Sequence, residues 1–358
     1  MEQEQQTPHK RRVRYKGKYP KKFEEKYKEL QPEKYQDTIE HVIKKGNTPA
    51  GMHISIMVQE ILDTLKIQPG ETGFDATLGY GGHTKAMLAC LNGQGHIYAT
   101  DVDPEESAKT KKRLEELGYG EDILTIRLQN FCTIDEIAKE AGGFDFILAD
   151  LGVSSMQIDN PKRGFSFKVD GPLDLRLNQE AGISAAERLD TITREELAGM
   201  LYENSDEPYC EELAKAITDE IRKGSRIDTT TKLREVIEKT LDFLPEKEKK
   251  DTIKKTCQRT FQALRIDVNR EFEVLYEFME KLPHALKPGG RVAILTFHSG
   301  EDKLVKKALK EGCRAGIYAD YSKDVVRPSA QECAQNGRAR STNCLLYTSP
   351  SPRDMRRS

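Results

Sequence analysis

The 358-residue sequence has no run of apolar residues near the roughly 18 that a membrane span requires. Its N-terminus, MEQEQQTPHK, lacks the apolar stretch of a secretory signal. Seven cysteines are present, but none belongs to a CxxC pair, which argues against a disulfide framework or a zinc site and for reduced thiols in a cytosol. The sequence therefore predicts a cytoplasmic protein without a metal centre.

A strong overall charge is also missing, because the net charge is only −2. The local distribution differs: residues 10–22, KRRVRYKGKYPKK, carry eight Lys or Arg residues and no acid, with Tyr15 and Tyr19 interleaved. Such an arm suits phosphate backbones, and its tyrosines could stack on bases. From charge alone, a solvated tail explains the segment equally well.

An alternation of strands and helices begins near residue 72. Apolar runs at 72–79, 95–101, 123–128 and 144–152 predict strands, and a helical pattern follows each of the first three. This order indicates a parallel sheet with right-handed crossovers. Residues 158–262 then contain only helical patterns. EFEVLYEFMEKLPHALKPGG, residues 271–290, predicts a helix with a Pro-Gly-Gly stop, and another buried strand is expected at 291–299.

The simplest interpretation is a single α/β domain with a helical domain inserted into it. The insert leaves after the fourth strand, at the carboxyl edge where open α/β sheets bind ligands, so it is well placed to cover a site. We expect a basic arm with a helical extension over residues 1–50, the α/β core over 51–157 and 263–343, and the insert over 158–262.

The stretch from Cys344 to Ser358, CLLYTSPSPRDMRRS, has neither strand nor helix periodicity. CLLYTSPSPRD resembles the translation of a sequencing-adapter sequence. We therefore expect residues 344–358 to be a non-native tail outside the fold, in place of the true C-terminus.

The motif DATLGYGGHT, residues 75–84, places a glycine turn after the first strand. No Lys follows the glycines, which excludes a P-loop, and Thr84 occupies the third glycine position of a dinucleotide fingerprint. A Gly-x-Gly-Gly turn is also typical of an S-adenosylmethionine pocket, where the backbone must approach the ligand closely.

Asp101, 22 residues after Gly79, lies at the tip of the next strand and could accept both ribose hydroxyls of either NAD or S-adenosylmethionine. Asp103, before Pro104, is better explained as a helix cap.

The third and fourth strands end in further candidates. Phe131 would lie beside an adenine or belong to the core. DLGVSS, residues 150–155, ends the fourth strand, where a methyltransferase of this architecture brings the methyl and the substrate atom together. An amine nucleophile needs only an acceptor for its N–H groups, whereas carbon methylation of cytosine needs a cysteine. DLGVSS and TFHS contain none, so the pattern favours an amine.

Ten motifs in order across residues 53–342 extend this interpretation. They are HISIMVQEIL, DATLGYGGHT, DVDP, NF, DLGVSSMQID, RGFSF, GPLDLR, TFQALRIDVNREF, FHSGEDKLVK and NGRARST. Together they closely resemble the bacterial small-subunit ribosomal RNA cytosine-N4 methyltransferase family, RsmH or MraW. The resemblance implies a class I S-adenosylmethionine-dependent methyltransferase fold, with a Rossmann-like sheet and an inserted all-helical domain. It also implies methylation of a cytosine amine in the decoding centre of 16S rRNA.

The resemblance further implies the roles of individual residues. Asp150 would hold the substrate amine near the methyl-bearing end of the cofactor. The cofactor contacts would be Gly81, Gly82, His83, Asp101, Phe131, Asp150 and Gln157. The sequence departs from the family pattern at FHSGEDK, where the family has FHSLEDR, so that Gly300 and Lys303 are unusual.

Several side chains have a structural explanation beside the functional one. His298 is better explained as organising the start of the next helix than as touching substrate. Arg163 could grip RNA, whereas Phe167 is better explained as anchoring the insert. Asp174 and Arg176 fit an ion pair with each other as well as a substrate contact.

Two other classes of function remain open. One is a non-catalytic rRNA-binding assembly factor of the small subunit, and the other is a methyltransferase for another amine. The small ribosomal subunit is the expected partner, and the sequence leaves open whether the protein forms a homodimer.

Overall fold

The computed structural model describes residues 55–321, 325–335 and 342–348. The predicted basic arm and its helical extension lie outside the described residues. Within the described part, no helix combines the length and the apolar character that crossing a membrane requires.

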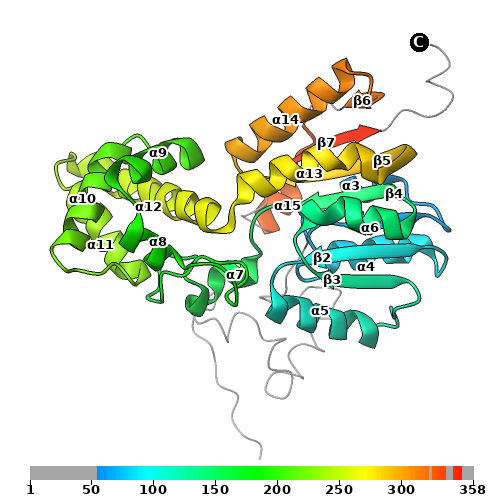
Figure 1. Cartoon of the computed structure of the whole chain (residues 1–358), viewed down its shortest axis with the longest axis horizontal. Coiled ribbons are helices and arrows are strands. Elements are labelled where there is room, and N and C mark those ends of the chain that lie inside the picture. Colours follow the sequence, from blue (N-terminus) through cyan, green and yellow to red (C-terminus); the bar gives the residue numbers. More distant parts are fainter. Residues whose placement is uncertain (1–54, 322–324, 336–341, 349–358) are drawn as a thin grey trace, which may run out of the picture. The chain divides into compact units, whose positions relative to one another are not determined.

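A seven-stranded sheet forms the centre of the fold, in the order β3-β2-β1-β4-β5-β7-β6 (Figure 1). The pairs β1–β2, β1–β4, β2–β3 and β4–β5 are parallel, whereas β7 is antiparallel to both β5 and β6. The strands are β1 (Thr72–Asp75), β2 (His96–Asp101), β3 (Leu124–Leu128), β4 (Phe144–Asp150), β5 (Leu286–Thr296), β6 (Asp320–Tyr321) and β7 (Asn343–Thr348). The expected class I methyltransferase arrangement, with a Rossmann-like parallel sheet, is confirmed.

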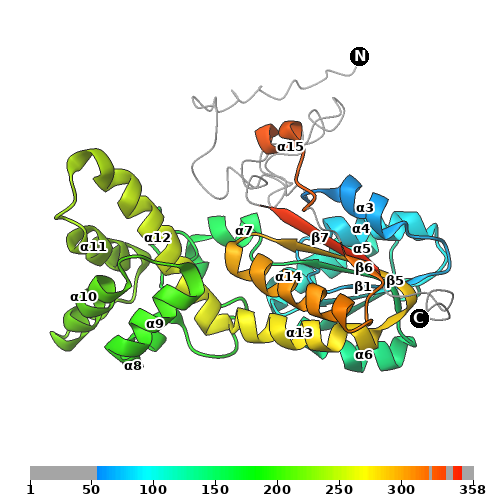
Figure 2. The ribbon, with the colours of Figure 1, turned by 90° about the horizontal axis from the view of Figure 1, so that it is seen from above.

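Helices cover both faces of the sheet (Figure 2). One apolar core packs α3, α4 and α5 against one face, and a second core packs α6, α13 and α14 against the other. The helices are α3 (Val58–Leu65), α4 (Gly82–Leu91), α5 (Pro104–Glu116), α6 (Ile134–Ala141), α13 (Glu271–Ala285) and α14 (Ser299–Arg314); η2 (Phe131–Thr133) precedes α6, and α15 (Ala330–Gln335) precedes β7. Because both faces are covered, the central strand FDFILAD is almost entirely apolar.

The helical insert has a hydrophobic core of its own, which runs from Leu173 to Leu264. Its elements are α7 (Ser155–Asp159), η3 (Pro161–Arg163), α8 (Ala185–Thr191), α9 (Arg194–Ser205), α10 (Cys210–Arg222), α11 (Thr230–Thr240) and α12 (Glu246–Asn269). The boundary expected at residue 262 falls inside α12, which continues to Asn269 and leads directly into α13.

The strand expected at 291–299 begins earlier than predicted. Helix α13 ends at Ala285, and β5 starts at Leu286, so the segment KPGG belongs to the strand and not to a helix stop. A register shift between Phe144 and Phe146 accommodates it. The backbone at Gly290 passes so close to Phe144 that a Cβ atom would lie 3.1 Å from its carbonyl oxygen. Gly290 therefore permits this close pairing, whereas Gly289 contributes a backbone φ of 80° that L side chains rarely adopt.

The exclusion of Cys344 onward from the fold was wrong for residues 344–348, which belong to β7 (Asn343–Thr348). Cys344 pairs with Leu295 and packs into the core under α3 and α4, whereas Leu345 pairs with Ile294 and packs into the opposite core. Side chains of β7 alternate between the two cores over only a few residues, so the sequence pattern did not reveal the strand. β7 supplies the hydrogen-bond partners that the edge of β5 would otherwise lack.

Candidate active site

The carboxyl ends of three neighbouring strands bring three acids to one edge of the sheet. Asp75 ends β1, Asp101 ends β2 and Asp150 ends β4. β1 lies between β2 and β4, so the glycine turn that follows β1 lies between Asp101 and Asp150. The sequence-predicted candidates on these strands thus converge at the topological switch point of the sheet.

The glycine turn is fixed by packing as much as by conformation. Gly79 and Gly81 have φ angles of 49° and 80°, which L side chains rarely adopt. A Cβ at Gly81 would lie 2.7 Å from Cγ2 of Thr110, and one at Gly82 would lie 2.0 Å from Oγ of Ser55. A Cβ at Gly79 would meet only a backbone oxygen at 3.8 Å, so the space beside Gly79 is open to a ligand.

Asp101 is held by backbone amides next to this turn. Its Oδ2 accepts from the Gly79 amide at 2.8 Å, and its Oδ1 accepts from the Asp103 amide at 2.9 Å. Burial raises the pKa of Asp101 to about 6, against the lowering effect of these two hydrogen bonds. Each carboxylate oxygen keeps a second lone pair, so the arrangement fits a ribose diol.

Asp150 lies on the other side of the turn, against His83. Its amide donates to Oγ1 of Thr77 at 2.7 Å, and its Oδ2 lies 3.4 Å from Nδ1 of His83. The opposite ring nitrogen of His83 contacts the carbonyl of Ile56 at 2.9 Å. Burial raises the pKa of Asp150 to about 6, His83 opposes that change, and Asp75 adds to it. Among the described residues, Oδ1 of Asp150 is buried and has no hydrogen-bond partner, and a functional role is one explanation for such an atom.

Asp75 was not among the site residues predicted from the sequence. Its side chain is buried and accepts from the Thr84 hydroxyl at 2.5 Å and from the Thr77 amide at 3.0 Å. Burial raises its pKa, and both hydrogen bonds oppose that change. Thr84, which breaks the dinucleotide fingerprint, therefore ties the first turn of α4 to the end of β1. The only feature of the sequence that could have indicated this contact is the spacing of Asp75 and Thr84 at the two ends of DATLGYGGHT.

Asp103 caps α5 as predicted, since its side chain accepts from the amides of the first turn of that helix. The same carboxylate accepts hydrogen bonds from Nε2 of Gln157 at 2.9 Å and from Nη2 of Arg163 at 2.5 Å. Arg163 also donates to the carbonyl of Leu177 at 2.7 Å. Arg163 therefore anchors the start of the insert to Asp103, at the beginning of α5, through a buried side chain.

The aromatic candidates pack into cores. Phe131 lies edge-on to Phe278 of α13, with ring centroids 5.2 Å apart, and is partly buried. Phe167 lies edge-on to Phe261 at 5.7 Å, so it packs within the insert's own core and not, as expected, against the α/β core.

A second polar cluster lies where the insert returns to the sheet. Both carboxylate oxygens of Glu271 accept from Arg265, at 2.8 and 2.9 Å. His298 caps α14 through the Glu301 amide, as expected, and Oε2 of Glu301 accepts from the Phe297 amide. One ligand-type atom each of Glu271, His298 and Glu301 lies within 4.8 Å of the others. Their contacts hold the junction of α12, α13 and α14 together.

The unusual residues of FHSGEDK fit their surroundings. Helix α14 begins at Ser299 despite Gly300, and a Cβ at Gly300 would lie 2.6 Å from the Phe272 ring. The space that a larger residue would need is thus taken by Phe272. Lys303 pairs with Asp206 of the insert at 3.9 Å on the surface.

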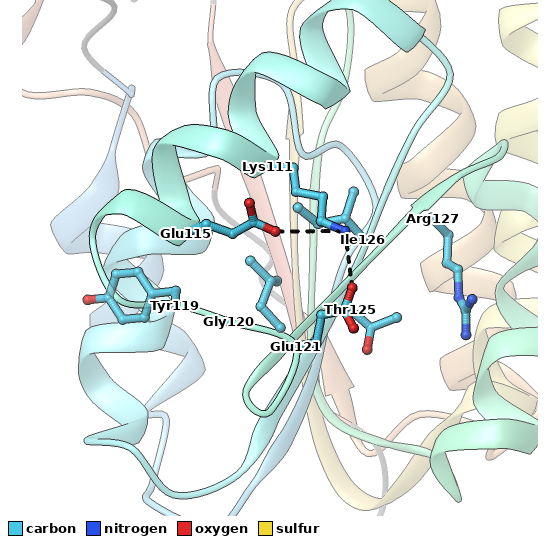
Figure 3. Close-up of a pocket in the computed structure, with 9 residues that line it drawn as sticks. Lys111, Glu115, Tyr119, Gly120, Glu121, Thr125, Ile126 and Arg127 are labelled. Atoms are coloured by element: carbon cyan, nitrogen blue, oxygen red, sulfur yellow. Dashed lines mark hydrogen bonds and ion pairs between the residues drawn. The ribbon is translucent and has the colours of Figure 1, made fainter.

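A surface pocket of about 260 Å³ lies away from these residues, beside the edge strand β3 (Figure 3). Lys111 spans it, with ion pairs to Glu121 at 3.1 Å and to Glu115 at 3.8 Å. The lining comes from the end of α5, the turn before β3 and β3 itself: Lys111, Glu115, Tyr119, Gly120, Glu121, Leu124, Thr125, Ile126 and Arg127. None of the predicted site residues contributes to it.

Residues 50–348 match the model of the MraW methylase family. The chain belongs to this family. The chain is 85% identical over 338 residues to Ribosomal RNA small subunit methyltransferase H 1 of Agathobacter rectalis, covering 94% of this chain and 97% of that protein. It is 69% identical to the protein of the same name from Lachnoclostridium phytofermentans, covering 94% and 92%. A solved structure of a putative rRNA methylase from Clostridium thermocellum is similar with a TM-score of 0.39 and 12% identity, covering 84% and 99%.

Membership in the MraW methylase family confirms the expectation of a methyltransferase with S-adenosylmethionine as its cofactor. The residues at the sheet edge fit that cofactor, because Gly79 leaves open space and Asp101 offers a ribose acceptor beside it.

Proposed function

We propose that this protein methylates the exocyclic N4 amine of a specific cytosine in the decoding centre of 16S rRNA. The observation that carries the proposal is the Asp150 carboxylate next to the glycine turn, which lies 3.4 Å from His83 and whose own backbone amide donates to Thr77. An amine nucleophile needs such an acceptor and needs no nucleophilic side chain. The names of the relatives, ribosomal RNA small subunit methyltransferases, support RNA of the small subunit as the substrate.

The cofactor site follows from the strand ends. Asp101 would hold the ribose hydroxyls, and the turn of Gly81, Gly82 and His83 would lie along the methionine part. Phe131 would border the adenine from the start of η2. Gln157 would close the site from the insert, through its bond to Asp103. S-adenosylmethionine, when bound, supplies an electrophilic methyl group.

The chain's own contribution to the reaction is orientation. Asp150 accepts an N–H of the cytosine amine and aims the nitrogen lone pair at the methyl carbon. The target base is unstacked from its neighbours and enters between the sheet edge and the insert. Arg163 and Gln157 fix the start of the insert to Asp103, so the covering domain and the sheet edge hold a common geometry. We infer a cytoplasmic enzyme that acts on the small ribosomal subunit.

The test incubates the protein and labelled S-adenosylmethionine with unmodified 30S subunits and with naked 16S rRNA, and maps the label by nucleoside mass spectrometry. Label in N4-methylcytidine at one position is expected, and Asp150→Asn should slow its formation by roughly 100-fold or more. Asp145→Asn is the matched control, because Asp145 lies at the other end of β4 and pairs with Lys287.

Other outcomes assign other functions. Label in another nucleoside, or in protein, would replace cytosine N4 with a different amine. A folded protein that binds S-adenosylhomocysteine and 30S subunits but transfers no methyl group would be an assembly factor.

A further inference from the structure

We propose that His83 is a positioning residue that keeps Asp150 anionic and ready to take the proton that the substrate amine releases, so that the two side chains form a proton-accepting pair. This inference rests on the function proposed above and deepens it, because it names the group that receives the proton.

The hydrogen bond to Ile56 determines which nitrogen of the His83 ring carries a hydrogen. A carbonyl oxygen can only accept, so Nε2, which lies 2.9 Å from the Ile56 oxygen, must carry a hydrogen. In a neutral ring, Nδ1 would then present a lone pair to Oδ2 of Asp150 at 3.4 Å. Two acceptors facing each other repel, so the arrangement is attractive only when the pair contains one further proton.

Other acids act on the same pair. Asp75 of β1 interacts electrostatically with both His83 and Asp150, and Glu301 of α14 interacts electrostatically with Asp150. Cys344 of β7 lies near Asp150 as well, but burial raises the pKa of its thiol to about 12, so it stays neutral. Among the charged groups that act on Asp150, His83 is the one that lowers its pKa.

The pair is enclosed but reachable. The side chain of His83 is 8% exposed, whereas that of Asp150 is 25% exposed at the sheet edge. The separation of 3.4 Å is longer than a formed hydrogen bond, so the interaction is chiefly between charges. The His83 ring can therefore act on the Asp150 carboxylate and still leave that carboxylate accessible to substrate.

The transfer step balances with this pair. The lone pair of the cytosine N4 nitrogen forms the new bond to the methyl carbon, and the carbon–sulfur bond breaks with its electrons left on sulfur. One proton passes from the nitrogen to the Asp150 carboxylate, which becomes neutral beside the His83 imidazolium. The proton leaves to water when the methylated base departs.

Two substitutions separate the charge of His83 from its tether to Ile56. His83→Gln can place its amide nitrogen near the Nε2 position and so keep the bond to Ile56, but it removes the cation that faces Asp150. His83→Asn can place a neutral donor near the Nδ1 position and loses the tether. His96→Gln is the control, because His96 lies at the start of β2 and contacts Thr125.

The decisive measurement does not depend on activity. The Asp150 carboxyl is followed by carbon NMR during a pH titration of full-length protein with labelled aspartate, and Asp150→Asn assigns its signal. The midpoint should lie near 6 in the wild type. It should be at least about 1 pH unit higher in His83→Gln, intermediate in His83→Asn, and unchanged in His96→Gln. An unchanged midpoint in His83→Gln overturns the inference.

Methyl transfer to 30S subunits provides the second measurement. The acidic limb of the rate–pH profile should move to higher pH in His83→Gln, with the rate recovering as the pH is raised. A uniform loss at every pH, with weaker binding of S-adenosylhomocysteine, would mean that His83 serves only the cofactor site and would overturn the proposal. If the wild type methylates no cytosine, the proposed function fails, while the NMR titration still decides whether His83 controls the charge of Asp150.

Discussion

Replacing Arg163 by Met should destabilise the protein by about 3–5 kcal/mol, because it leaves a buried carboxylate without its cation. The side chains of Arg163 and Asp103 are only 5% and 1% exposed, and their charged atoms lie 2.5 Å apart. Met fills a similar volume, so the loss is chiefly electrostatic. Urea denaturation gives the free energy of unfolding, and hydrogen exchange should report faster opening of residues 155–163.

A matched substitution tests whether burial is the cause. Arg127 pairs with Glu140 at 2.8 Å, but these side chains are 44% and 52% exposed. Arg127→Met should therefore cost at most about 1 kcal/mol. Adding Asp103→Asn to Arg163→Met should recover part of the loss, because Asn still caps α5 and carries no charge. The reasoning is refuted if Arg163→Met destabilises the protein no more than Arg127→Met does.

Three further outcomes are expected. Asp101→Asn should weaken S-adenosylhomocysteine binding by about 10- to 100-fold in calorimetry at pH 7.5, and wild-type affinity should fall below pH 6, where Asp101 becomes protonated; equal affinities would contradict the ribose role. Asp150→Asn should raise the free energy of unfolding at pH 7.5 by up to about 3 kcal/mol and leave it unchanged near pH 4. The pKa of Asp150 in the folded protein is about 6, above the usual 3.8, so its ionisation costs stability only as the pH rises through this window. A loss of stability in Asp150→Asn at pH 7.5 would contradict this prediction. Gly82→Ala should cost about 1–3 kcal/mol, since its Cβ would lie 2.0 Å from Oγ of Ser55; adding Ser55→Gly should restore the unfolding midpoint, and no recovery would place the strain elsewhere.

Most of the sheet could be predicted from the sequence because its parallel strands are buried on both faces. FDFILAD is buried at every position except its two aspartates for that reason, and the alternation with helices specified the topology. β7 was missed because its pattern spans only six residues. The KPGG segment was misassigned because Pro and Gly usually end helices, whereas here Gly290 permits a close approach of β5 to Phe144.

The strand-end acids of the candidate site could be predicted from spacing, but their partners could not. Asp101 and Asp150 follow from the position of the glycine turn. The bond between Arg163 and Asp103 joins residues 60 positions apart across two structural layers, and no local pattern encodes it. The contact of His83 with Asp150 likewise depends on how α4 lies against β4.

The position of the insert has a consequence for the order of folding. β4 ends at Asp150 and its neighbour β5 begins at Leu286, so an unfolded insert would be a loop of roughly 135 residues between paired strands. Closing such a loop costs about 4 kcal/mol of chain entropy beyond a constant. Because the insert has its own core from Leu173 to Leu264, it can collapse first and bring α7 and the end of α12 together. Nucleation within the insert would then shorten the chain that separates the two central strands, and the rate of sheet completion would depend on residues far from the sheet.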